Sequence, residues 1–103
     1  MKEIFSKLVG VTFHNRQDNL QLVNAGFNLF WKCEEDNPFD KNAIIVYADP
    51  EMKIELGHIK KELAAELQGY IGAKREIKII AEQLTGTLPK QTFGLNVKIL
   101  IEE

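Results

Sequence analysis

Two short segments of the sequence carry polar and aromatic side chains in combinations that suit ligand binding. Residues 37–44 (NPFDKNAI) join an amide, an aromatic ring and a carboxylate in a turn that leads into an apolar run. Residues 57–64 (GHIKKELA) place a glycine, a histidine and a basic pair at the start of a helical pattern. Amide and carboxylate groups at the mouth of a small barrel commonly hold polar ligands, and the amides of a helix start can bind phosphate. The two segments therefore favour a binding site.

The first segment has a purely structural interpretation as well. In that interpretation Pro38 fixes its own φ, Phe39 packs inward, and Asp40 or Asn42 bonds nearby backbone amides. His58 would then simply bond a backbone carbonyl. The sequence by itself leaves both interpretations open.

Metal binding and catalysis find little support in the residue types present. The soft metal ligands are Cys33, His14 and His58, and no two of them stand at a zinc-type spacing. Cys33 alternates with Trp31 on a predicted core face, where a single cysteine usually behaves as a small hydrophobe. There is no glycine-rich phosphate loop and no hydrolase-type pair of acids. We therefore predict no metal, no cofactor and no enzymatic activity.

Composition and charge restrict the kind of partner. The chain has 103 residues, 45% of them hydrophobic, and a net charge of −2, so we expect one globular domain over residues 1–103 without a membrane segment. A single cysteine argues for a reducing compartment, and we expect a cytoplasmic protein. Nucleic-acid binders usually carry a broad basic surface, which is missing here, so any such site must be local. Lys60 and Lys61 would supply its cations, while Arg16 is either a solvated loop residue or a further phosphate contact.

The hydrophobic pattern is mostly that of strands. Alternating or continuous apolar runs predict strands, and a 3.6-residue period with a glycine after it predicts one helix. The expected elements are strands at 7–13, 27–33, 43–48, 54–59, 77–81 and 95–101, a loop at 14–19, a helical turn at 20–23, a helix at 60–71 and a link at 85–90. This order predicts a mainly β fold with one or two short helices, as a small OB-like or SH3-like antiparallel barrel. The alternative is an open antiparallel sheet with the helix on one face.

Three blocks of the sequence resemble the HIRAN domain family, which occurs at the front of some replication-repair helicases and as stand-alone proteins of bacteria and phages. The blocks are residues 9–13 (VGVTF), 34–46, which include the NPFDKNAI turn, and 57–64. Together they span most of the chain, and the middle block is the specific one. The resemblance implies a modified OB-like barrel, and it implies a receptor for the 3′ end of single-stranded DNA.

The resemblance also implies roles for residues on the two sides of such a receptor. Phe13 and His14 match an aromatic pair that stacks on terminal bases, although Phe13 suits a core position equally well. Asn37 and Asp40 match the amide and the carboxylate that contact the terminal nucleotide and its 3′-hydroxyl.

The remaining matches are accompanied by departures from the family pattern. His58 and Lys61 match side chains that lie near the DNA backbone, and Phe93 matches a late aromatic that closes the pocket, although a core position suits Phe93 better. Thr12 stands where the DNA-end-binding members have a basic residue, and residues 33–35 (CEE) replace an Arg-Glu-Pro sequence. Fewer cations and more acids predict weaker DNA affinity.

The first functional hypothesis is therefore a non-enzymatic, monomeric module that binds single-stranded DNA and prefers a free 3′-hydroxyl end. Its context would be DNA repair or replication-fork processing, with a protein of the DNA-repair machinery as a further partner. The alternative is a protein–protein recruitment module without DNA contact, which the acidic balance and Thr12 favour. A phosphoesterase acting on DNA ends ranks last, because it needs a metal beside Glu34, Glu35 and Asp40.

Overall fold

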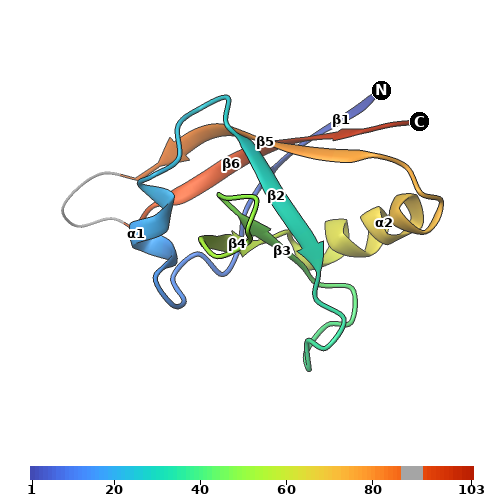
Figure 1. Cartoon of the computed structure of the whole chain (residues 1–103), viewed down its shortest axis with the longest axis horizontal. Coiled ribbons are helices and arrows are strands. Elements are labelled where there is room, and N and C mark those ends of the chain that lie inside the picture. The colour runs from blue at the N-terminus through green and yellow to red at the C-terminus, as the bar shows by residue number, and fades with distance from the viewer. Residues whose placement is uncertain (87–91) are drawn as a thin grey trace.

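The computed structural model describes residues 1–86 and 92–103, and within them the fold is mainly β with two short helices (Figure 1). The elements are β1 (Lys2–Lys7), α1 (Arg16–Leu20), β2 (Asn28–Cys33), β3 (Ile44–Tyr47), β4 (Glu55–His58), α2 (Lys61–Gly72), β5 (Ile77–Thr85) and β6 (Gly94–Ile101). This confirms the predicted fold class. None of the described helices has the length and apolar character that a membrane crossing requires.

The strands form one antiparallel sheet in the order β1-β6-β5-β2-β3-β4, which curls into a half-barrel. Its two outer strands are joined where the chain leaves β1. Val9 and His58 exchange both backbone hydrogen bonds at 2.9 Å, so the segment after β1 lies against β4. Gly57 permits this approach, because a Cβ there would lie 2.8 Å from the Val9 carbonyl oxygen. The junction brings residues 9–16 beside the helix-start segment.

The core follows from the alternation of the strands. Every second residue of β6 from Leu95 to Ile101 is buried, and β3 is buried along its whole length, as its continuous apolar run predicts. Helix α2 contributes Ala64 and Leu67 to the same core. Full burial of a leucine such as Leu67 stabilises the fold by about 1.5–3 kcal/mol. In Figure 1 the two helices lie at opposite ends of the sheet.

Three predicted elements near the N-terminus differ from the structure. The strand expected at 7–13 is instead β1, and residues 11–14 form turns, because the backbone reverses at Gly10 (φ +66°) and His14 (φ +54°). The loop expected at 14–19 is largely helix α1, and the helical turn expected at 20–23 begins earlier than predicted. Helix α1 forms because its first and last residues are buried against the barrel, which tertiary contacts decide rather than local propensity.

The other predicted elements agree closely with β2, β3, β4, α2 and β6, whereas the strand expected at 77–81 continues to Thr85 as β5. The link expected at 85–90 begins in the last residue of β5 and in Gly86, and its residues 87–90 lie outside the described part of the chain.

Candidate nucleic-acid interface

A cavity of about 420 Å³ opens where the β1–α1 connection, the turn after β2 and the start of α2 meet. It is lined by Val9, Gly10, Phe13, His14, Arg16, Asn37, Phe39, Asp40, Ala43, His58, Ile59 and Lys61. The structure thus brings together, from three separate parts of the sequence, most of the residues predicted to bind DNA. Two of the predicted residues, Thr12 and Phe93, are not among those that line it.

The wall after β2 is organised by the side chain of Asn37. Its Oδ1 accepts hydrogen bonds from the backbone amides of Phe39 (2.8 Å) and Asp40 (3.1 Å), and its Nδ2 donates to Glu34 Oε1 (2.9 Å). Asp40 Oδ1 accepts from the amide of Asn42 at 2.9 Å. The structural interpretation of this turn is therefore correct for Asp40, and Asn37 makes bonds of the same kind that it did not include. Within the described residues one N–H of Asn37 and the second oxygen of Asp40 keep their hydrogen-bonding capacity, so both side chains can also meet a ligand.

The rings of Phe13 and Phe39 are exposed at this cavity. Phe13 is 63% exposed and Phe39 is 91% exposed, and both line the cavity. The expectation that Phe39 packs inward is wrong, and Phe13 does not take the core position that its sequence also allowed. Phe39 is a ligand-facing candidate that the sequence reasoning missed, because phenylalanine is usually buried and nothing in the turn marks this one as different.

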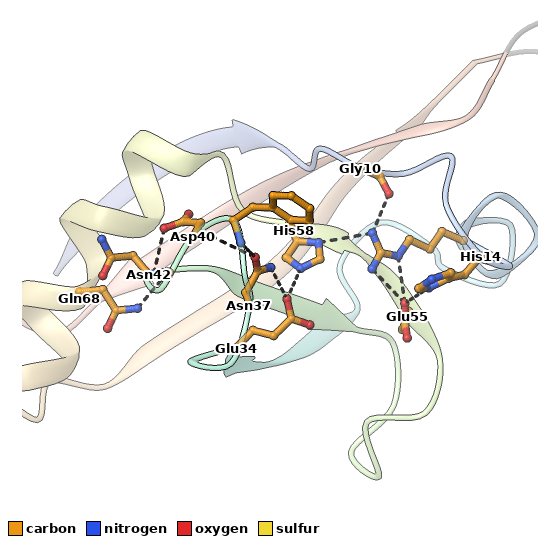
Figure 2. Close-up of polar contacts among 11 residues, drawn as sticks. Gly10, His14, Glu34, Asn37, Asp40, Asn42, Glu55, His58 and Gln68 are labelled. Atoms are coloured by element: carbon orange, nitrogen blue, oxygen red, sulfur yellow. Dashed lines mark hydrogen bonds and ion pairs between the residues drawn. The ribbon is translucent and has the colours of Figure 1, made fainter.

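The centre of the interface is a chain of ionisable side chains (Figure 2). His58 Nε2 lies 2.8 Å from Glu34 Oε1, and His58 Nδ1 lies 3.3 Å from a terminal nitrogen of Arg16. Arg16 also donates two hydrogen bonds to Glu55 Oε1, at 3.1 Å from Nε and 2.9 Å from Nη2. His14 Nδ1 lies 2.9 Å from that same Glu55 oxygen. His58 therefore bonds charged side chains rather than a backbone carbonyl.

These contacts shift the acidity of both glutamates. Burial works to raise the pKa of Glu34, but hydrogen bonds from His58 and Asn37 outweigh it, and the pKa lies below its ordinary value. The pKa of Glu55 is lowered chiefly by the hydrogen bond from His14, with Arg16 adding to the effect against the opposing influence of burial. Both groups are therefore ionised at neutral pH.

Arg16 is the residue for which the sequence was least informative. It was expected either to be solvated or to reach a phosphate, but it is only 4% exposed and its N–H groups are directed to protein partners. Its position in a polar stretch of sequence gives no sign of burial. The contacts form only when β4 lies beside the start of α1.

The cations of the interface belong to the start of α2. Lys61 is exposed and lines the cavity, and Lys60 caps the helix without a side-chain hydrogen bond. The first amides of a helix carry partial positive charge and favour anions. The other charges at or next to the cavity are the Arg16 guanidinium and the carboxylates of Asp40, Glu34 and Glu55, so acids and cations are equal in number there.

Phe93 and Thr12 lie outside the cavity for different reasons. Phe93 is partly buried against the hydrophobic core, and Gln17 bonds both its backbone N–H (2.6 Å) and its carbonyl oxygen (2.9 Å). The core position suggested for Phe93 by its sequence is confirmed. Thr12 is exposed in the turn before Phe13. Across the described residues, no three His, Cys, Asp or Glu side chains gather as a metal site would require.

Comparison with known proteins places the chain in a family. The family model described as the HIRAN domain matches residues 1–101. The chain belongs to the HIRAN domain family. This confirms the family resemblance noted in the sequence. HIRAN domains are known as DNA-binding modules that are generally non-catalytic, and a nucleic-acid-binding role fits this member.

Two solved structures share the HIRAN fold of this chain. The crystal structure of the HIRAN domain of human HLTF matches with a TM-score of 0.68 and 25% identity, covering 98% of this chain and 77% of that one. A crystal structure of a protein from Lactobacillus plantarum matches with a TM-score of 0.66 and 15% identity, covering 95% of this chain and 98% of that one. At that identity the second match shows the fold alone. The comparison with curated proteins gave no match.

Proposed function

We propose that this HIRAN domain is a non-enzymatic module that binds single-stranded DNA and prefers a free 3′-hydroxyl end. The observation that carries the proposal is the cavity, which Asp40, with one carboxylate oxygen free among the described residues, lines together with two exposed rings and the start of a helix. A role in DNA repair or replication-fork processing, as a monomer, follows from the family resemblance.

Base stacking supplies the part of the affinity that does not depend on sequence. Phe13 and Phe39 expose their rings at the cavity, so bases can stack on them. Stacking of a base on an aromatic side chain contributes about 1–3 kcal/mol per base and tolerates any sequence. This contribution needs no excess of cations, which suits a chain of net charge −2.

End recognition depends on the chemistry of Asp40. An ionised carboxylate only accepts hydrogen bonds, and a terminal 3′-hydroxyl has a proton to donate. A 3′-phosphate, or the phosphodiester of a continuing strand, would bring negative charge to the same oxygen. Because like charges in contact repel one another, such ends should bind more weakly than a 3′-hydroxyl end.

The preceding phosphate of the bound strand has its partners at the start of α2. Lys61 provides a cation that lines the cavity, and the first amides of the helix provide donors. His58 is not a phosphate cation in this mechanism, because both of its ring nitrogens already bond protein side chains.

Fluorescence anisotropy with a short single-stranded oligonucleotide tests the proposal. A 3′-hydroxyl end is expected to bind about tenfold or more tightly than the same strand with a 3′-phosphate, and Asp40→Ala is expected to remove that preference. Asp18→Ala, at an exposed carboxylate of α1, serves as the matched control. Equal affinity of the wild-type protein for both ends would contradict end recognition.

The second candidate is a protein-recruitment module, which the net charge of −2 and the uncharged Thr12 favour. Salt distinguishes the two candidates. Phosphate contacts release counterions, so DNA affinity falls steeply as the salt concentration rises. Oligonucleotide binding that is absent at low salt would favour a protein partner.

A further inference from the structure

We propose that Arg16 is a positioning residue of the cavity: its guanidinium fixes His58 in the neutral Nε2–H tautomer and, through Glu34 and Asn37, sets the turn that presents Asp40. The inference deepens the proposed function and rests on it only for the DNA measurements, because the tautomer is a property of the free protein.

The tautomer follows from the donors available at each nitrogen. A guanidinium has no lone pair to offer and can only donate, so at 3.3 Å from Arg16 the Nδ1 of His58 must be the acceptor. The ring proton then lies on Nε2, which donates to the Glu34 carboxylate 2.8 Å away. A proton on Nδ1 would oppose an N–H of Arg16 and would add positive charge beside the guanidinium. The geometry therefore leaves one protonation state of His58 that satisfies both partners.

The second step transmits this arrangement to the ligand-binding turn. Glu34 Oε1 accepts from His58 Nε2 and from Asn37 Nδ2 (2.9 Å), so the ring and the amide share one carboxylate oxygen. With its Nδ2 held there, Asn37 directs Oδ1 to the amides of Phe39 and Asp40. Figure 2 shows Glu34, Asn37 and His58 next to one another and Glu55 on the far side of His58. An unbroken series of hydrogen bonds thus runs from α1 through β4 to the wall after β2.

The hydrogen-bond partners around residue 16 match the donors of an arginine side chain. Arg16 donates from Nε and Nη2 to Glu55, and from Nη1 to the carbonyl oxygen of Gly10 at 2.7 Å as well as to His58. A lysine, with its donors at a single nitrogen, cannot reach all three partners at once. Gly10 provides the space for the guanidinium, because a Cβ at this position would lie only 3.2 Å from Nη1 of Arg16. The Arg16 side chain is 4% exposed and bonds three protein partners, so its main role is to organise the site rather than to bind the strand.

Nitrogen-detected NMR of the two histidine rings tests the first step in the free, unmodified protein. The chain has two histidines, and the structure assigns them opposite donors: Nε2–H for His58 and Nδ1–H toward Glu55 for His14. We expect His58 to show the chemical shifts of a neutral Nε2–H ring at pH 7. A His58 ring that carries its proton on Nδ1, or that is positively charged at this pH, would overturn the proposal.

Variants of the arginine test the step from His58 to the turn. In Arg16→Met, and in Arg16→Lys should the first variant unfold, the His58 resonances are expected to move toward a mixture of tautomers. The affinity for a 3′-hydroxyl oligonucleotide should fall by about tenfold, comparable to the loss of a hydrogen bond to a charged group. Arg75→Met is the matched control, at the exposed second arginine of the chain, and should change neither readout. Unchanged His58 resonances in a folded Arg16 variant would overturn the proposal.

A double-mutant cycle locates the route of the effect. If Arg16 acts through the turn, Arg16→Met in an Asp40→Ala background should lower the affinity for the 3′-hydroxyl oligonucleotide by clearly less than tenfold. The reason is that the carboxylate that Arg16 positions is already absent. Full additivity would contradict the relay. Should the wild-type protein not bind the oligonucleotide, the proposed function fails, while the tautomer of His58 still decides whether Arg16 holds the ring.

Discussion

The two walls of the cavity are stabilised in different ways. The turn after β2 is stabilised mostly by contacts between near neighbours, with Asn37 and Asp40 bonding backbone amides two or three residues away. The opposite wall, residues 9–16, is stabilised by partners far along the chain: Arg16 and His14 bond Glu55, which is 39 and 41 residues away. The turn can therefore form from its own residues, with the long-range bond from His58 to Glu34 adding to its position, whereas the second wall exists only when β4 lies beside α1. The proposed binding site therefore consists of a turn with mostly local bonds and a wall that folding assembles.

The assembled wall should be the more sensitive of the two to loss of one group. Glu55→Ala leaves the buried guanidinium of Arg16 without its carboxylate and releases His14 from its positive φ of 54°. Removing one partner of a buried ion pair costs about 3–5 kcal/mol, and because Glu55 itself is 31% exposed we expect about 3 kcal/mol. Urea unfolding of the variant measures this loss. Glu51→Ala, at an exposed turn position, should stay within about 0.5 kcal/mol of wild type.

A loss for Glu55→Ala no greater than that of Glu51→Ala would mean that water replaces the carboxylate without cost. The difference between the two walls would then be one of sequence distance and not of stability.

Acidification should weaken both walls together. The pKa values of Glu34 and Glu55 are lower in the folded protein than in the unfolded chain. Their contribution to the free energy of unfolding is therefore fully present above the ordinary glutamate value of 4.5 and is lost as pH falls through the lowered folded-state values. Urea midpoints measured between pH 7 and pH 3 should stay level at first and then decline.

Single replacements separate the two contributions to this decline. Glu34→Gln and Glu55→Gln should each flatten the acid limb of the stability curve, because each removes one group that takes up a proton on unfolding. Each variant should also lower the stability at pH 7. If neither replacement changes the decline in stability at acid pH, other carboxylates are responsible for that decline.

The smallest expected effect on stability is that of replacing Phe39, the exposed ring in the turn after β2. Phe39 is 91% exposed, so Phe39→Ala should change the free energy of unfolding by less than about 0.5 kcal/mol. If the ring stacks on a base, however, the same substitution should weaken oligonucleotide binding by about 1–3 kcal/mol. Thermal unfolding and anisotropy measured on one preparation test both expectations.

The control for that substitution is a phenylalanine outside the cavity lining. Phe27 is 45% exposed and is not among the residues that line the cavity, so Phe27→Ala should leave binding unchanged. Equal binding by the Phe39→Ala variant and the wild-type protein would mean that the turn after β2 does not contact a base. Its contribution to binding would then be limited to the Asp40 carboxylate.

The sequence by itself determined the parts of this protein whose signal is short-range. Strand periodicity gave β2 to β6 and helical periodicity gave α2, because burial on one face repeats every two or 3.6 residues along the chain. The bond of Asp40 to a nearby backbone amide was equally predictable, since it joins near neighbours. The family resemblance was also readable from short segments, at residues 9–13, 34–46 and 57–64, and the match over residues 1–101 confirms it.

Only the tertiary structure decided the rest. Helix α1, the burial of Arg16 and the pairing of His58 with Glu34 depend on contacts between segments that lie far apart in the sequence, and no local pattern reports them. The exposure of Phe39 could not be predicted either. The sequence shows that the ring is hydrophobic, but it does not show that no other segment packs over it. Side-chain types and local spacing fix what each segment can form alone. Which charges meet in the cavity, and which rings stay uncovered, is fixed by how the sheet closes.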